Sequence, residues 1–185
     1  MFLSDKEKNI PTHLANSAAL LTQSIRKPTA WARPGIALYG VSPSPALKDR
    51  VSLTPAMRLK ARIIHLKTLD KGQSVSDGRT YFTKKKSKVA TLGIGYADGL
   101  HRALSNKGHC LVRGQKVPLI GTICMDMTMA DVSSAAGVKV GDTATLFGQD
   151  GGRFLSVEEQ ATLAGTISYE LLCAVGERVP RVYVK

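Results

Sequence analysis

The sequence contains few cysteines, few aromatic residues and no long apolar run. Only Cys110, Cys124 and Cys173 are cysteines, and no two of them have C-x-x-C spacing. A small, odd number of cysteines is typical of a protein with reduced thiols, so we expect a cytoplasmic location, no disulfide and no metal site. Since no stretch of about 18 apolar residues occurs and the N-terminus lacks an apolar signal-peptide core, we expect no membrane association.

Acidic residues are also scarce. The 185 residues include 26 Lys and Arg but only 14 Asp and Glu, which gives a net charge of +12. Such a charge favours an anionic partner, but the cations are dispersed, apart from Lys84, Lys85 and Lys86 followed by Lys88. Because aromatic residues make up only 5% of the chain, few side chains are available to stack on bases. We therefore expect a solvated basic surface, and nucleic acid is an unlikely partner by composition.

Residues 1–54 have mixed helical and turn character. The stretch ANSAALLTQSI (15–25) is helical in pattern, and Asn16 and Ser17 are candidate N-cap residues. The segment ARPGIALYG (32–40) is a glycine-containing turn that leads into a short apolar run. Residues 41–55, VSPSPALKDRVSLTP, contain three of the eight prolines and are typical of a linker.

Residues 55–185 have the pattern of short strands. Strands are predicted within residues 57–69, 87–97, 109–121, 122–132, 142–152 and 177–185, with a hairpin turn at Arg113 and Gly114. One late helix is predicted in SVEEQATLAG (156–165), where Ser156 and Glu159 have the spacing of a capping box. This pattern predicts a mainly β, barrel-like domain.

Six segments together resemble the alanine racemase family, whose members are pyridoxal 5'-phosphate (PLP) enzymes. The segments are HLANSAAL (13–20), ARPGIALYG (32–40), GYADG (95–99), RGQKVPLIGTICMDM (113–127), TISYELLC (166–173) and ERVPRVYV (177–184). Family members consist of a PLP-binding (β/α)8 barrel followed by a β domain. The resemblance implies that residues 1–54 are the C-terminal end of such a barrel, without its front, and that residues 55–185 are the family's β domain.

The resemblance assigns five residues to the cofactor. Ser17, the turn at Gly35 and Ile36, and Tyr169 match residues that contact the PLP phosphate, in keeping with loops that follow the last barrel strands. Arg33 matches an arginine that faces the pyridine nitrogen; because arginine keeps its proton, that nitrogen stays unprotonated and the ring withdraws electrons less strongly. His13 matches the group that orients this arginine. Ser17 could be a simple N-cap and still contact the phosphate, and His13 could be a core histidine. Without the resemblance, Tyr169 would be interpreted as a half-buried strand tyrosine.

The resemblance also assigns residues to the substrate, alanine, whose D-isomer bacteria use for peptidoglycan. Met125 matches a residue whose backbone N–H holds the substrate carboxylate, and Tyr96 and Arg102 match residues that line the substrate corridor. In the family all three are donated by the partner subunit, so the resemblance implies a homodimer with shared active sites.

Asp77, in SVSDGRTY (74–81), occupies the position where the family has a tyrosine. By local pattern it is only a hairpin-tip residue. In the family the tyrosine is one of two catalytic bases, which racemisation needs because a proton leaves one face of the α-carbon and returns on the other. Aspartate is shorter than tyrosine, and it loses its proton near pH 4 instead of near pH 10. Tyr81 lies about 13 Å further along a regular strand, so it cannot take over this role.

The family's PLP-binding lysine has no counterpart in a matching context among the 185 residues. We therefore expect the isolated chain to be inactive, and three hypotheses remain. The chain is a C-terminal racemase portion that works with a lysine-bearing portion, or a non-catalytic remnant of such an enzyme. The third possibility is a β module that binds nucleic acid or another anion, for which no motif was found.

Overall fold

A computed structural model describes residues 13–22 and 31–184. The chain divides into two compact units, Met1–Met57 and Arg58–Lys185, which are treated separately. Among the described helices, none is long and apolar enough to cross a membrane.

The first unit contains a parallel strand pair and short helices. Strand β1 (His13–Asn16) leads directly into α1 (Ser17–Leu21), and β2 (Trp31–Arg33) runs parallel to β1. The chain continues through two 3-10 helices, η2 (Ile36–Tyr39) and η3 (Pro45–Leu47). Asn16 is the N-cap of α1, since its side chain accepts a hydrogen bond from the Ala19 N–H at 3.0 Å. The part of the predicted helix that falls in residues 23–30 lies outside the described residues.

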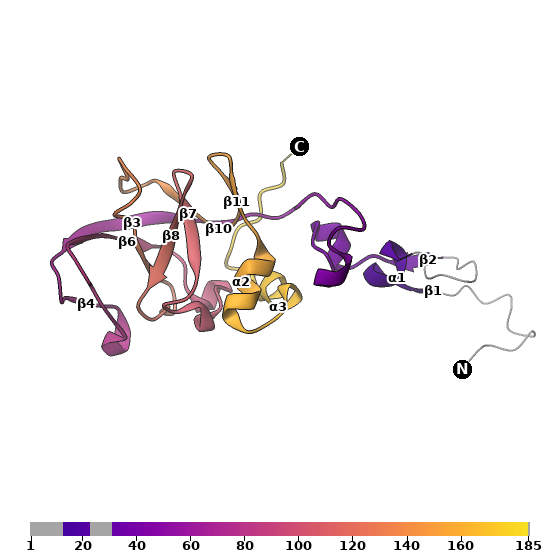
Figure 1. Cartoon of the computed structure of the whole chain (residues 1–185), viewed down its shortest axis with the longest axis horizontal. Helices are drawn as coiled ribbons and strands as arrows, with labels where there is room; N and C mark the ends of the chain where they lie inside the picture. The colour runs from indigo at the N-terminus through magenta and orange to yellow at the C-terminus, as the bar shows by residue number, and fades with distance from the viewer. Residues whose placement is uncertain (1–12, 23–30, 185) are drawn as a thin grey trace, which may run out of the picture. The chain divides into compact units, whose positions relative to one another are not determined.

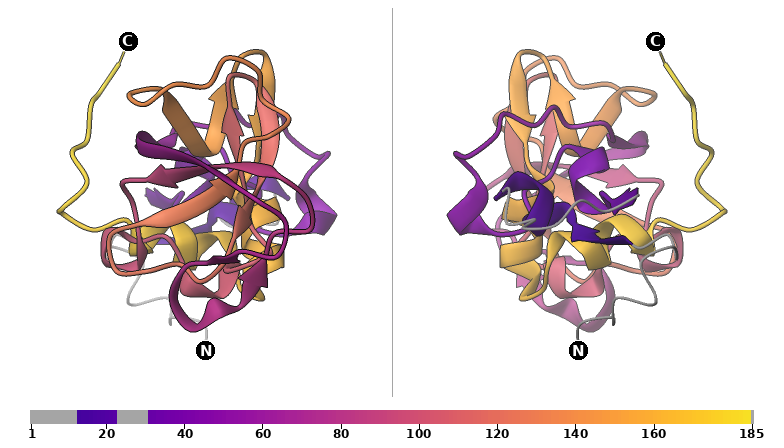
Figure 2. Two further views of the ribbon diagram at one scale, coloured as in Figure 1. Left: turned by 90° about the vertical axis from the view of Figure 1, so that its left-hand side faces the viewer. Right: turned by 90° about the vertical axis from the view of Figure 1, so that its right-hand side faces the viewer.

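The second unit is built around a closed antiparallel barrel of six strands, as predicted. These strands are paired in the order β10 (Thr143–Asp150), β3 (Leu59–Leu69), β6 (Ser87–Leu92), β9 (Thr128–Asp131), β8 (Gln115–Ile120) and β7 (His109–Val112). Pairing of β7 with β10, with Ala144 opposite Val112, closes the barrel. The short β11 (Arg153–Leu155) extends β10 as a hairpin. Figures 1 and 2 show the crossing strands of this domain.

The first part of β3 shows how the barrel interior is filled by an alternation of apolar and polar residues. In β3, Leu59, Ala61 and Ile63 are buried, whereas Lys60 and Arg62 face solvent. Side chains at alternate positions point to opposite faces of a strand, so a period of two fills the interior with apolar groups. The other strands complete this core, which includes Leu92, Leu111, Val117, Leu119, Ala130 and Leu146.

The predicted hairpin between β7 and β8 is confirmed. Arg113 and Gly114 have φ values of 50° and 72°. Two successive residues with positive φ form the type of tight turn whose twist matches that of antiparallel strands. The strands pair from Val112 opposite Gln115 to His109 opposite Pro118.

Helix α2 (Val157–Ala164) begins where the sequence predicts. Its N-cap Ser156 accepts a hydrogen bond from the Glu159 N–H at 3.1 Å. The Glu159 carboxylate forms an ion pair with Lys116 of β8, so the hydrogen bond at Ser156 is the serine half of the predicted box. The buried Gln160 side chain donates to the carbonyl oxygens of His109 and Leu146, which attaches α2 to the barrel.

Two predictions for the C-terminal region are wrong. A second late helix, α3 (Ser168–Ala174), packs beside α2 (Figure 1), and the sequence pattern did not indicate it. The predicted strand at residues 177–185 is absent from its described part, residues 177–184. Pro180 lacks an N–H donor for a strand pair, and the Arg181 guanidinium instead binds the carbonyl oxygens of Val175 and Gly176.

The three cysteines lie in different environments and are free thiols. Cys110 is completely buried in β7, and this burial raises the pKa of its thiol to about 12. Cys173 is exposed on α3.

We expect iodoacetamide at pH 8 to modify Cys173 readily and to leave Cys110 unmodified, because alkylation requires an accessible thiolate. Peptide mass mapping of the native chain measures both rates, with a urea-unfolded sample as control. Because burial disfavours the Cys110 thiolate in the folded state, this thiol leaves the free energy of unfolding at its full value below pH 9. The free energy of unfolding then falls as the pH rises from 9 towards 12. Equal native rates at Cys110 and Cys173 would contradict the buried position.

Candidate functional site

The predicted phosphate-contacting residues of the first unit lie together. Ser17 starts α1 at the end of β1, and it is buried. Its hydroxyl oxygen accepts a hydrogen bond from the Ala37 N–H at 3.2 Å, which joins it to the turn that contains Gly35 and Ile36. Among the described residues, the N–H groups of Gly35 and Ile36 donate no hydrogen bond, and a Cβ at Gly35 would meet nothing within 4 Å. A hydroxyl beside two free N–H donors with open space fits a phosphate group.

Arg33 and His13 lie on the paired strands of this unit, but they do not contact each other directly. In the parallel register Arg33 lies opposite Asn16, whereas His13 lies opposite Trp31. Both residues are exposed, and no hydrogen bond joins them within the described ranges. The orienting role of His13 therefore stays a prediction, and its interpretation as a core histidine does not agree with its exposure.

In the second unit, two loops that carry Tyr96 and Met125 pair through their backbones. The Tyr96 N–H donates to the Cys124 carbonyl at 3.0 Å, and the Ala97 N–H donates to the Met125 carbonyl at 2.9 Å. A Cβ built on Gly95 would lie 2.3 Å from the Cys124 oxygen and 2.4 Å from Met125 backbone atoms. The loops approach this closely because residue 95 is glycine.

The Met125 N–H is a free donor at this loop pair. It makes no hydrogen bond to any described residue, and the Met125 side chain is 57% exposed. A free N–H in an ordered loop can bind a carboxylate oxygen. The geometry thus supports the chemistry that the sequence predicts for Met125.

Asp98 stabilises the loop that carries Tyr96, and sequence reasoning did not single it out. One oxygen of its carboxylate accepts a hydrogen bond from the Gly95 N–H at 2.9 Å. Its other oxygen lies 3.3 Å from the Arg178 guanidinium. The aspartate in GYADG was a visible signal, because an acidic residue three positions after a glycine turn commonly accepts the turn's N–H.

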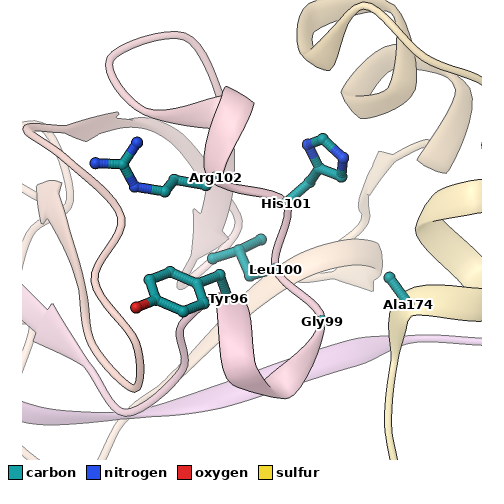
Figure 3. Close-up of a pocket in the computed structure, with 6 residues that line it drawn as sticks. All are labelled: Tyr96, Gly99, Leu100, His101, Arg102 and Ala174. Atoms are coloured by element: carbon teal, nitrogen blue, oxygen red, sulfur yellow. The ribbon is translucent and has the colours of Figure 1, made fainter.

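Tyr96 and Arg102 line one surface pocket with a volume of about 390 Å³. Tyr96 belongs to η5 (Tyr96–Asp98) and Arg102 to η6 (Arg102–Leu104). Figure 3 shows both side chains projecting to the same side, whereas the His101 ring points away from them. The structure thus brings together the two residues predicted to line the substrate corridor.

Helix α3 reaches the same region. It contributes Ala174 to the pocket lining, and its Glu170 carboxylate lies 4.0 Å from the His101 ring. Tyr169 is 41% exposed on this helix. The strand interpretation of Tyr169 is therefore wrong, and its predicted contact with phosphate stays a prediction.

Asp77 lies in a turn, as its local pattern predicts, and this turn packs against the Cys124 loop. The turn, η4 (Asp77–Arg79), connects β4 (Ser74–Val75) to β5 (Tyr81–Phe82). The Asp77 carboxylate accepts a hydrogen bond from the Cys124 thiol, with the sulfur 3.2 Å from Oδ2. Sequence reasoning missed Cys124, since its partner lies 47 positions away and no spacing rule relates the two.

The turn is held in place by residues on both of its sides. Ser76 has a φ of 65°, and its hydroxyl donates to the Thr122 carbonyl at 2.5 Å. Asn106 donates to the Thr80 hydroxyl at 3.0 Å and accepts from the Gly121 N–H at 2.6 Å. The position of Asp77 is therefore defined by several hydrogen bonds.

Tyr81 has a different, structural environment. It packs against the buried cluster of Leu69, Val75, Val89 and Ile120. Burial, assisted by the charge of Asp131, raises the pKa of its hydroxyl. Tyr81 thus contributes to packing, in keeping with the prediction that it does not replace the missing tyrosine.

Within the described parts of the chain, no group of three or more His, Cys, Asp or Glu side chains is placed to hold a metal.

Two family models match the chain. Residues 56–183 match the alanine racemase C-terminal domain, and residues 2–43 match the alanine racemase N-terminal domain. Alanine racemase from Methanococcus maripaludis is 47% identical over 188 residues, which cover 99% of this chain and 50% of that protein. Alanine racemase from Citrifermentans bemidjiense is 48% identical over 174 residues, which cover 93% of this chain and 46% of that protein.

Solved structures of alanine racemases have the same fold. The enzyme from Bacillus anthracis with bound L-Ala-P superposes with a TM-score of 0.87 at 38% identity, covering 97% of this chain and 47% of that one. The enzyme from Bartonella henselae with covalently bound pyridoxal phosphate gives a TM-score of 0.82 at 34% identity, covering 93% and 46%. The chain spans about half the length of these relatives. With 128 consecutive residues (56–183) matched to its C-terminal domain, the chain belongs to the alanine racemase family.

Proposed function

We propose that this chain supplies the C-terminal portion of a PLP-dependent alanine racemase that interconverts L- and D-alanine. In this proposal residues 1–54 complete a cofactor-binding barrel and residues 55–185 form the β domain. The observation that carries the proposal is the loop pair of Tyr96 and Met125, which leaves the Met125 N–H free beside the position of the family's base. The product D-alanine would serve peptidoglycan synthesis.

Residues of the first unit would hold the cofactor. Ser17 and the free N–H groups of Gly35 and Ile36 would bind the phosphate. Arg33 would donate to the pyridine nitrogen and keep it unprotonated. When bound, PLP supplies an electron sink that makes the α-proton of the amino acid labile.

Residues of the second unit would act on the substrate. The Met125 N–H would bind the alanine carboxylate, and Tyr96 with Arg102 would line the path to it. By the family pattern these residues serve the site of a partner subunit, so we propose a homodimer with two shared sites and a cytoplasmic, soluble enzyme.

The proposal assigns the lysine base to a portion of the enzyme outside these 185 residues. None of the lysines here has the matching context. Racemisation requires a proton-transfer group on each face of the α-carbon. We therefore expect the chain by itself not to interconvert the alanine isomers.

The test is reconstitution with an N-terminal half of an alanine racemase that carries the lysine. Co-expression with PLP is expected to yield racemase activity when Asp77→Tyr restores the family's base, and at least about tenfold less with the native Asp77, because a well-placed general base contributes about 10²–10⁴-fold. D-alanine formation from L-alanine, measured by chiral chromatography, gives both rates.

A matched control is Asp126→Asn in the Asp77→Tyr background, since Asp126 is an exposed acidic residue next to Met125 without an assigned role. It is expected to keep most of the activity. If the two halves co-purify but neither the native Asp77 enzyme nor the Asp77→Tyr enzyme shows racemase activity, the chain is not a competent racemase portion and the proposed function is wrong.

A further inference from the structure

The Asp77 turn places a thiol against the residue that stands where the family has its tyrosine base. The Cys124 sulfur lies 3.2 Å from the Asp77 Oδ2 atom and 3.3 Å from the Ser76 hydroxyl. Cys124 is half-buried, whereas Asp77 and the neighbouring Met125 are exposed. The Thr122 carbonyl oxygen is a third, more distant polar neighbour of the sulfur at 3.6 Å. The thiol also adjoins the free Met125 N–H that would bind the substrate carboxylate.

A thiol suits proton transfer at this position better than a carboxylate. Cysteine thiols ordinarily lose their proton near pH 8.5, which is closer to the value of about 10 for tyrosine than to the value of about 3.9 for aspartate. A general acid and base works best when it can both hold and release a proton near the operating pH.

We propose that Cys124 is the proton donor and acceptor on the face of the substrate that tyrosine serves in relatives, and that Asp77 is its positioning residue. This inference rests on the proposed function. In the donating direction the Cys124 S–H bond breaks, a C–H bond forms at the α-carbon, and the electron pair of the broken bond stays on sulfur as a thiolate. In the other direction the thiolate takes the α-proton, and the thiol is restored.

Asp77 would act by accepting the thiol hydrogen bond. The contact directs the S–H group towards the carboxylate oxygen 3.2 Å away. The hydrogen bonds from Ser76 to Thr122 and from Asn106 to Thr80 keep the turn in this position. The substitution of tyrosine by aspartate would thus transfer the proton-moving role to a neighbouring residue.

The first test measures the thiol in the full chain without cofactor. Iodoacetamide modification at pH 8, followed by peptide mass mapping, compares Cys124 in the native chain and in Asp77→Asn. Removal of the carboxylate is expected to raise the Cys124 rate by about threefold or more, because the sulfur loses the hydrogen-bond acceptor that holds its hydrogen and becomes easier to attack. Cys173, which is exposed on α3, serves as the internal reference and is expected to be unaffected. An unchanged ratio of the Cys124 rate to the Cys173 rate would overturn the pairing.

The second test is a double-mutant cycle in the reconstituted racemase. With Asp77 present, Cys124→Ala is expected to lower racemisation by about 100-fold, which is the usual loss when a general acid and base is removed. In the Asp77→Tyr background the same substitution is expected to change the rate by less than about threefold, because the tyrosine then moves the proton. Cys173→Ser is the matched control and is expected to leave both rates unchanged.

The outcomes separate this inference from the proposed function. Equal losses on Cys124→Ala in both backgrounds would indicate a structural role and overturn the inference. Racemase activity with Asp77→Tyr but none with the native Asp77 would also overturn the inference, while the proposed function would stand. Absence of racemase activity in every combination of variants would contradict the proposed function and the inference that rests on it.

Discussion

Replacing Ile63 by alanine is expected to lower the free energy of unfolding of the barrel domain by about 2–5 kcal/mol, the usual cost of a buried Ile-to-Ala change. Ile63 is 1% exposed and lies opposite Leu92 on the neighbouring strand. Its N–H donates to the Asp142 carbonyl and its carbonyl accepts from the Gly141 N–H, each at 2.8 Å. The side chain therefore cannot be lost without a cavity in the barrel interior, and urea unfolding followed by circular dichroism measures the cost.

The adjacent Ile64 provides the matched control. It is 49% exposed, and it lies at the irregularity where the pairing of β3 with β6 shifts register. Ile64→Ala is expected to cost less than about 1 kcal/mol, because little apolar area is removed from the interior. Equal costs for the two substitutions would contradict the inside and outside assignment of β3.

Replacing Gly95 by alanine is expected to destabilise the domain by about 1–3 kcal/mol and to separate the Tyr96 loop from the Met125 loop. The added methyl group would lie 2.3 Å from the Cys124 oxygen and 2.4 Å from Met125 backbone atoms. Backbone atoms on both sides cannot move aside as a flexible side chain can. The hydrogen bonds from Tyr96 and Ala97 to the facing loop are therefore expected to break, and the free energy of unfolding measures the effect.

Gly176→Ala is the matched control for this substitution. A Cβ at Gly176 meets nothing within 4 Å, and its backbone has no positive φ. We expect the control to change stability by less than about 0.5 kcal/mol. In the reconstituted racemase Gly95→Ala is also expected to lose most of its activity, and full activity would show that the loop pair is not needed at the site.

Features that depend on near neighbours in the chain were predictable from the sequence. The alternation in residues 59–63 predicts the buried face of β3, because successive strand side chains point to opposite faces. Asn16 and Ser156 predict the starts of α1 and α2, because an N-cap bonds to an N–H only three positions away. The Arg113 and Gly114 turn is equally local.

Features that depend on partners far away in the chain could not be predicted from the sequence. Residues 177–184 have strand-like composition, but strands need a partner, and here Arg181 folds back onto Val175 and Gly176. Helix α3 follows α2 after a short turn and packs against it, so its position depends on tertiary contact more than on local pattern.

The family, a mainly β, barrel-like domain and the aspartate at the position of a base were all readable from the sequence. These follow from the order of motifs and from periods that each segment carries on its own. Three features emerge only from the folded chain: the contact of the Asp77 carboxylate with the Cys124 thiol across 47 positions, the ion pair of Asp98 with Arg178, and the Met125 N–H that is left free. Each depends on how segments remote in the sequence come together, and no local pattern encodes that, because closing a long loop gains stability only through the contacts of the whole fold.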